Sequence, residues 1–217
     1  MTYVILEPVE KDLKVIRGFS TFNWNGFTPS TVNYYKIVSV GDTDWTNWGV
    51  SSASAGDIFK PNATTSGSGT GTVISAFQET TTTFTNLDGS VIDYTPAAGA
   101  SKVIYEFNSV YGYKEVKNGF QVKLQNGSNL ANLADISSDN YICSFGQTNN
   151  TTGYYGSELL QVRFVIDAWS GQKTLGLKVK SFDTNASRAS LINVSTPSTD
   201  ELEEGLLYDP FVMCYSI

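Results

Sequence analysis

The sequence predicts an all-β protein in which a small N-terminal β module precedes a larger β-sandwich. Apolar and polar residues alternate in one segment after another, which is the period of strands that bury one face. Glycine, serine, threonine and asparagine are abundant, and charged residues make up only 16% of the chain. This balance favours short strands and turns over long surface helices. Hydrophobic residues are 41% of the 217 residues, enough for one large β core or two small ones.

Residues 1–30 are predicted to form an arm that anchors the protein. Tyr3–Leu6 can form a strand, and Glu7–Arg17 carries helix-tolerant residues on the downstream side of a proline. Several large aromatics stand among small polar residues, and they must be buried either on the following segment or on another chain. We expect docking on another chain, because a terminal arm with aromatic anchors suits assembly. The candidate anchors are Phe19, Phe22, Trp24 and Phe27.

Residues 31–80 are predicted to form the small β module. Strands are expected at Tyr34–Val40, Asp57–Lys60 and Val73–Phe77. The glycine-rich run between the last two lacks the Lys-Ser/Thr pair of a phosphate loop and has no helix after it, so we expect a structural turn. The module is too small to bury a large core alone and should pack on a neighbour or on copies of itself.

Residues 81–217 are predicted to form a β-sandwich domain, which the resemblance given below identifies as a jelly roll. Val103, Tyr105 and Phe107 alternate with Ile104 and Glu106, as in a strand with one buried face. We expect the later alternating segments to stack with this one as two facing layers. These segments are 119–125, 140–145, 160–166, 174–180, 191–194 and 211–217.

Two local patterns in this region carry further expectations. Asn126–Gly127 follows an alternating segment and predicts a tight hairpin turn. The final segment is apolar at Phe211, Met213, Tyr215 and Ile217, whereas a free end is normally polar. The last strand is therefore expected either at the centre of a sheet or at a subunit contact.

Composition argues against several functional classes. The formal net charge of −7 argues against a nucleic-acid surface, which needs a basic stripe. The chain has no histidine, so Ser-His-Asp catalysis, Cys-His catalysis and histidine-ligated metal sites cannot form from it. We expect no catalytic residues, no metal site and no cofactor.

The cysteines and the apolar segments indicate in which cellular compartment the chain is made. Cys143 and Cys214 each lie in a strand-like segment and are expected to be buried free thiols, with a disulfide between them as the alternative. The first residues lack the pattern of a signal peptide, and no apolar segment approaches the length of a bilayer span. The expectation is a chain made in a cytoplasm, without membrane insertion.

Carbohydrate chemistry has two candidate sets of residues. A glycosidase needs two carboxylates close together in a cleft, and Asp167 with Asp183, or the acidic run Glu201–Glu204, could supply them. Turn aspartates are common for backbone reasons, so hydrolysis is the weaker possibility. Tyr154, Tyr155 and Trp169 lie in loops with amide neighbours and could stack on sugar rings, or could instead pack beneath those loops.

Two regions resemble structural proteins of marine phages. The first is similar to a module of tail-fibre and other virion proteins, although Trp45 stands where the usual pattern has Phe; it comprises Tyr35–Trp45, Ala55–Phe59 and Ser66–Val73. The second resembles the TNF/C1q-like jelly roll at the ends of phage appendages; it comprises Asp93–Pro96, Ser101–Phe107, Leu160–Ile166 and the apolar final segment.

This resemblance implies a homotrimeric knob located on the virion and assembled in the host cytoplasm. It implies a role in host recognition, as a tail fibre, or in capsid decoration, with no catalytic residues. Other virion proteins would bind the N-terminal region, and a host-surface glycan is a further candidate partner. Tyr105, Phe107, Met213 and Tyr215 are candidate residues of the trimer contact, with the core of the single chain as the alternative. The alternative function is a lectin-like or carbohydrate-active protein acting on cell-surface glycans.

Overall fold

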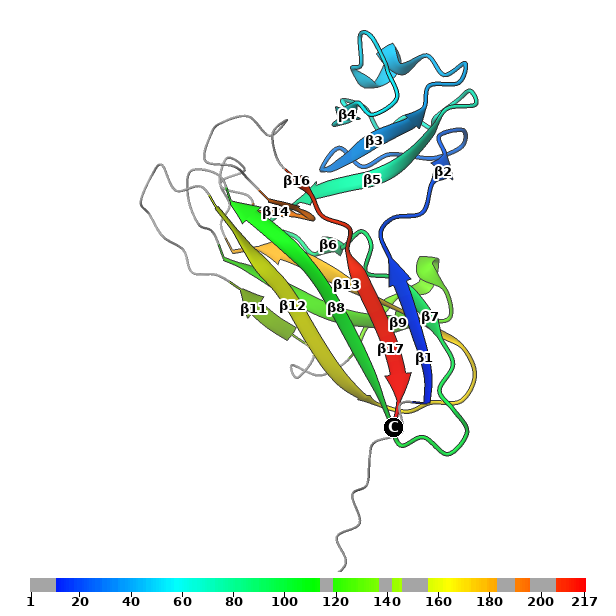
Figure 1. The fold of residues 1–217 in the computed structure, drawn as a ribbon, viewed down its shortest axis with the longest axis vertical. Helices are drawn as coiled ribbons and strands as arrows, with labels where there is room; N and C mark the ends of the chain where they lie inside the picture. Colours follow the sequence, from blue (N-terminus) through cyan, green and yellow to red (C-terminus); the bar gives the residue numbers. More distant parts are fainter. Residues whose placement is uncertain (1–10, 114–118, 137–141, 146–155, 183–189, 196–205) are drawn as a thin grey trace, which may run out of the picture.

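The computed structural model describes residues 11–113, 119–136, 142–145, 156–182, 190–195 and 206–217, and these ranges are mainly β-strands (Figure 1). Two short 3₁₀ helices interrupt them, η1 at Trp45–Trp48 and η2 at Leu130–Asn132. The predicted all-β class is therefore confirmed. None of the helices in the described ranges has the length and apolar character that crossing a membrane requires.

The larger sheet has nine strands, of which β8 and β12 are the longest with twelve residues each. Its strand order is β1-β17-β8-β14-β5-β3-β4, with β12 paired to β8 and β2 paired to β5. The strands β8 and β12 pair antiparallel over twelve residues, from Lys102 opposite Asp167 to Tyr113 opposite Gly156. The bounds are β1 Lys11–Arg17, β2 Phe22–Asn23, β3 Asn33–Ser39, β4 Ile58–Phe59, β5 Thr72–Glu79, β8 Lys102–Tyr113, β12 Gly156–Asp167, β14 Ser190–Ile192 and β17 Phe211–Ser216.

A second sheet of six strands lies behind the first in Figure 1. Its order is β10-β9-β13-β6, with β11 paired to β9 and β7 paired to β13. A separate pair joins β15 to β16. The bounds are β6 Thr85–Asn86, β7 Ile92–Tyr94, β9 Phe120–Gly127, β10 Ala134–Asp135, β11 Ile142–Phe145, β13 Lys173–Ser181, β15 Val194–Ser195 and β16 Leu206–Leu207.

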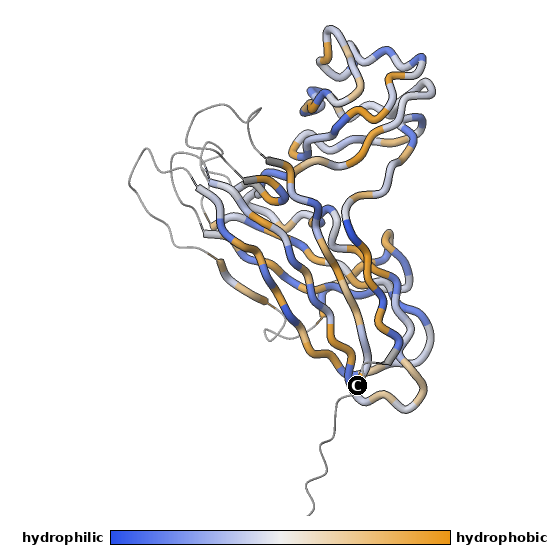
Figure 2. Tube along the Cα trace, viewed as in Figure 1, coloured by the Kyte–Doolittle hydropathy of each residue, from blue (hydrophilic) through white to orange (hydrophobic). Residues whose placement is uncertain are grey.

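The two sheets pack face to face over one hydrophobic core, as the alternating pattern predicts. Tyr105 and Phe107 of β8 share this core with Val122 of β9 and Leu177 of β13, and all four are almost fully buried. The colouring of Figure 2 follows the same principle, since hydrophobic and hydrophilic residues alternate along the long strands. The β-sandwich is thus a direct result of strands with one apolar face.

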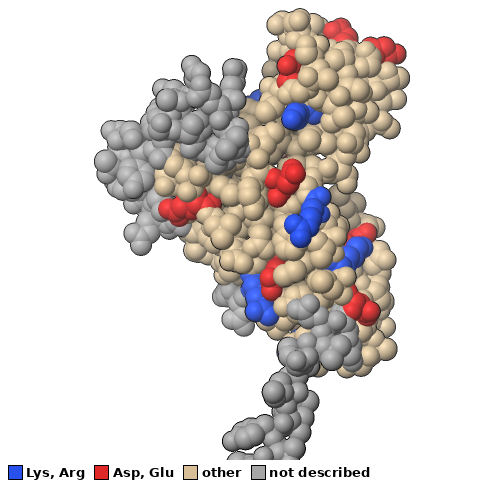
Figure 3. Space-filling view, viewed as in Figure 1, with Lys and Arg blue, Asp and Glu red and all other residues tan. Residues whose placement is uncertain are grey.

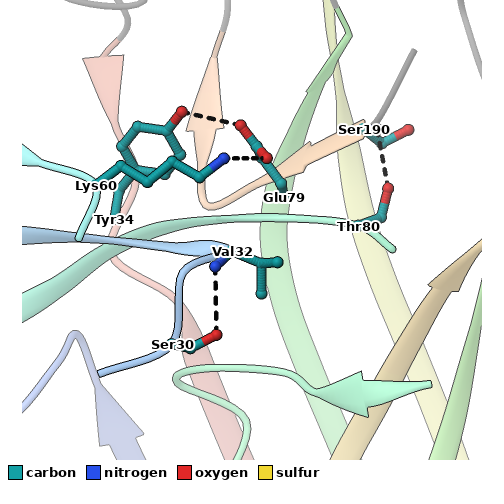
Figure 4. Close-up of polar contacts among 7 residues, drawn as sticks. All are labelled: Ser30, Val32, Tyr34, Lys60, Glu79, Thr80 and Ser190. Atoms are coloured by element: carbon teal, nitrogen blue, oxygen red, sulfur yellow. Dashed lines mark hydrogen bonds and ion pairs between the residues drawn. The ribbon is translucent and has the colours of Figure 1, made fainter. Parts of the chain in front are cut away.

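The nine-stranded sheet continues beyond the sandwich into a small aromatic module. There β3, β4 and β5 support a second core, in which the Trp24 ring lies 5.3 to 5.6 Å from the rings of Tyr35, Trp45, Trp48 and Phe59. The two parts meet where β5 ends. As Figure 4 shows, the Tyr34 hydroxyl donates to Glu79 and Lys60 pairs with Glu79, while the backbone N–H of Ser190 donates to the Thr80 hydroxyl.

Residues 11–17 differ from the expected arm. They form β1, an edge strand that pairs with β17 from Arg17 opposite Phe211 to Lys11 opposite Ser216. The helix-tolerant composition of Glu7–Arg17 is overridden here by hydrogen bonding to a neighbouring strand. The division of the chain at residues 30 and 80 stays a prediction, since one sheet runs from the sandwich through β14 and β5 into the module.

Three other local expectations have different outcomes. Asn126–Gly127 does not make a tight turn, because β9 runs through Gly127 and the chain reverses over η2 before β10. The last strand, β17, lies between β1 and β8 and is therefore central in its part of the sheet. Cys143 is half-buried, Cys214 is buried, and both are free thiols; burial raises the pKa of both and brings that of Cys214 to about 12.

Candidate functional site

The outward side of β1, β17, β8 and β12, here called the outer sheet face, carries exposed apolar side chains among polar and charged ones. The strand register aligns Val15, Met213, Glu106 and Arg163 across it. Beside this row, Val165 is 50% exposed. Figure 3, which views this side, shows mostly uncharged surface, on which several positive and negative groups lie next to one another. Exposed apolar side chains on one sheet face make that face a candidate interaction surface.

The charged groups at the centre of the outer sheet face are paired with one another. Arg163 Nε lies 3.1 Å from Glu106 Oε1, and Arg163 Nη2 donates to the Tyr215 hydroxyl at 3.0 Å. The Tyr215 hydroxyl in turn donates to Glu106 Oε1 at 3.3 Å. Because these three groups satisfy each other, another chain could cover the face without leaving an unpaired buried charge.

The four predicted trimer-contact residues separate onto two sides of the sheet. Tyr105 and Phe107 are fully buried and point into the core between the sheets, so they cannot contact another subunit, and that part of the prediction is wrong. Met213 and Tyr215 point to the outer sheet face, where Met213 is half-buried and Tyr215 is 7% exposed. Their role in a trimer contact stays a prediction.

The predicted anchor aromatics belong mainly to the chain's own second core. Trp24 is fully buried there, and Phe22 and Phe27 are half-buried against it. Docking of Trp24 on another chain is therefore excluded, and packing on the following segment is what the structure shows. Phe19 is half-buried and approaches Gly89.

Trp169 lines a cavity of about 460 Å³ formed by residues 96–100 and 168–171. Its ring packs edge-on against Tyr94 at 6.3 Å, and the Lys173 ammonium lies 5.3 Å from its centre. Its role in glycan binding stays a prediction, because Tyr154 and Tyr155 lie outside the described residues. Trp169 is therefore a half-buried packing residue with one side on a cavity.

Of the carboxylates considered for hydrolysis, the structure describes only Asp167. Asp167 is exposed and pairs with Lys102 at 2.5 Å. Asp183 and Glu201–Glu204 lie outside the described residues. Within the described ranges, no group of three or more cysteine, aspartate or glutamate side chains is close enough to hold a metal ion.

A larger cavity, of about 600 Å³, lies where the aromatic module meets the sandwich. We call it the junction cavity. Its lining combines aromatic, amide and carboxylate side chains, including Phe22, Phe27, Asn33, Tyr35, Gln78 and Asp88. Sequence reasoning missed this site, because its residues are spread over more than sixty positions from Phe22 to Asp88 and form no local motif. A cluster of asparagines beside the predicted anchor aromatics was the one signal that could have indicated it.

Comparison with known proteins gives distant structural likenesses only. No family model matches the chain, and no curated protein matches its sequence. The stem and receptor-binding domain of the spike protein P1 from bacteriophage PM2 aligns with 97% of this chain and 99% of its own, at 11% identity and a TM-score of 0.30. Eiger TNF from S. frugiperda aligns with 65% of this chain and 90% of its own, at 8% identity and a TM-score of 0.26.

A capsid chain is also among the similar structures. A chain of the Cowpea Mosaic Virus empty virus-like particle aligns with 97% of this chain and 88% of its own, at 9% identity and a TM-score of 0.23. At TM-scores this low, the function of the chain has to be argued from its own residues.

Proposed function

We propose that the protein is a structural component of a phage virion that assembles as a homotrimeric knob on the tail or capsid surface. The observation that carries this proposal is the outer sheet face, where exposed apolar residues surround a charge cluster that is already neutralised. The centre of this surface suits burial by identical copies, because the charges of Glu106 and Arg163 already pair with each other. The sequence resemblance to phage tail-fibre and jelly-roll proteins supports the virion location.

The role proposed is one of assembly, without catalysis. A rigid sandwich that extends into a compact aromatic module can present a fixed surface at the outside of a particle. Host recognition and capsid decoration both need such a knob. The N-terminal region would contact other virion proteins, as its position beside β17 at the edge of the large sheet allows.

Light scattering coupled to size-exclusion chromatography tests the assembly directly. We expect a particle of three times the 23.6 kDa of the chain. A monomer at micromolar concentration would contradict the trimer. Labelling with an antibody and electron microscopy of the particle then distinguishes a tail location from a capsid location, and absence of the protein from purified particles would contradict the virion role.

A further inference from the structure

The junction cavity has one aromatic wall. The rings of Phe22 and Phe27 lie 4.7 Å apart, and the Phe27 ring lies 5.6 Å from that of Tyr35. Tyr35 is buried, whereas Phe22 and Phe27 are half-buried and line the cavity. The backbone holds this wall, since Gly67 N–H donates to the Phe27 carbonyl at 2.7 Å. Two phenyl rings are therefore presented to the cavity without large conformational freedom.

The cavity also has a polar wall, which contains an unused hydrogen-bond acceptor. Asn33 Nδ2 donates to Asp88 Oδ2 at 2.7 Å. Asn33 is only 7% exposed, yet its Oδ1 has no hydrogen-bond partner among the described residues. A buried acceptor without a partner is costly and rare in folded proteins. Asn33 is one of the residues that line the cavity.

Buried contacts behind this wall hold Asp88 in place. Gln78 is 1% exposed; its Oε1 accepts from the Asp88 backbone N–H at 3.1 Å, and its Nε2 donates to the Asn86 carbonyl at 2.7 Å. Burial raises the pKa of Asp88 to about 6, opposed by hydrogen bonds from Ser75 and Asn33. The carboxylate is thus fixed in position and mainly ionised at neutral pH, which suits it to accept hydrogen bonds from a ligand.

The charge of the lining selects the class of ligand. All the lining residues are described, and they include one carboxylate and no lysine or arginine. Phosphates, nucleotides and acidic sugars would meet an uncompensated negative charge there. Amide and carboxylate groups can instead bind adjacent hydroxyls, while the phenyl faces pack against the C–H side of a ring. Asn23, Asn25 and Asn86 add further amide groups around the same cavity.

We propose that the junction cavity is a binding site for a neutral saccharide of one or two rings. Its volume of about 600 Å³ lies within the usual range of small-molecule sites. In the bound state, sugar hydroxyls donate to the Asp88 carboxylate and bind the amide of Asn86, and the ring packs on Phe27. The site differs from the cavity beside Trp169 and from the outer sheet face, so it is independent of trimer formation.

Saturation-transfer NMR on the full chain tests whether the protein binds a neutral saccharide. The neutral probes are glucose, galactose, mannose, N-acetylglucosamine and their β-linked disaccharides. Choline and N-acetylneuraminic acid serve as cationic and anionic probes. We expect saturation transfer to at least one neutral sugar and to neither charged probe. Transfer to no neutral sugar, or to choline alone, overturns the proposal.

Variants then locate the binding by calorimetry with whichever neutral sugar responds. Asp88→Asn keeps the shape of the side chain and Phe27→Leu removes the aromatic face, and each is expected to weaken binding about tenfold or more. Asn25→Ala within the lining has a matched control in Asn47→Ala, an exposed asparagine outside it, and only the first should weaken binding. Circular dichroism confirms that each variant is folded. Loss of binding in Trp169→Leu, with Asp88→Asn and Phe27→Leu unaffected, would overturn the assignment.

Discussion

The Tyr105 hydroxyl donates a 2.6 Å hydrogen bond to the Ser90 carbonyl inside the sandwich, where both residues are fully buried. Ser90 also accepts through its hydroxyl from the Leu177 backbone N–H at 3.0 Å, and it donates to the Leu87 carbonyl at 2.6 Å. The long strand β8 is thereby tied to the strand β13 of the opposite sheet. A single tyrosine thus joins the two layers through a polar contact within an apolar core.

Replacing Tyr105 by Phe should destabilise the protein by about 1 to 2 kcal/mol, because the ring stays packed and only the buried hydrogen bond is lost. Urea unfolding followed by circular dichroism measures this. Tyr208→Phe is the matched control, since Tyr208 is 40% exposed, and its effect should stay within about 0.5 kcal/mol. Equal stability of the two variants would show that the bond between the layers contributes nothing.

Replacing Gly67 by Ala should destabilise the aromatic module by about 3 kcal/mol. A Cβ at this position would lie 2.0 Å from the Trp24 carbonyl oxygen and 2.6 Å from its ring, so backbone and core would both have to move. Gly26→Ala is the control, because it has a positive φ of 76° but open space around its Cβ. That variant should lose only about 1 kcal/mol. Differential scanning calorimetry compares the two, and the reverse order would contradict the packing of Trp24.

Replacing Asp88 by Asn should remove one part of the dependence of stability on pH. The pKa of Asp88 is about 6 in the folded protein against 3.8 for an ordinary aspartate, so the folded state binds more protons than the unfolded state between these values. This group therefore lowers the free energy of unfolding as the pH rises from about 4 to about 6. Relative to Asp88→Asn, the parent protein should lose about 2 kcal/mol over that range.

Chemical denaturation at a series of pH values measures that difference. The Asp88→Asn variant serves as the reference for the parent protein, because all other titrating groups are common to both. Parallel stability curves for parent and variant would mean that the surroundings of Asp88 do not raise its pKa. A parent curve that gains stability relative to the variant with rising pH would indicate a favourable partner for the charge.

Replacing Val165 by Lys should convert the proposed trimer to a monomer without unfolding the chain. Val165 is 50% exposed on the outer sheet face, so the single chain tolerates the change, whereas a lysine buried between copies would lack a partner. Val38→Lys, at 43% exposure in the module strand β3, is the matched control and should stay trimeric. Light scattering distinguishes the masses, and a Val165→Lys protein of unchanged mass would exclude this face as the contact.

The strands and their buried faces could largely be predicted from the sequence, because alternation with a period of two is a local property of the chain. The residues Val103, Tyr105 and Phe107 show this, and all three lie in the core as their pattern indicates. Alternation does not predict which strands pair with one another, because pairing depends on residues far apart in the chain. The strand β1 could not be predicted from the sequence for that reason. It is stabilised by hydrogen bonds to β17, which lies at the other end of the chain.

The last strand shows most clearly what only the tertiary structure decided. From the sequence, its more apolar set, which includes Met213 and Tyr215, has two possible places, the core of the single chain or a subunit contact. The register instead places Val212 opposite Phe107 and Cys214 opposite Tyr105, so the smaller side chains enter the core and the larger ones face outward. A shift of one residue in register would exchange the two faces. The composition and alternation of the chain therefore determined a β-sandwich, whereas long-range pairing decided which side of it is left to meet a partner.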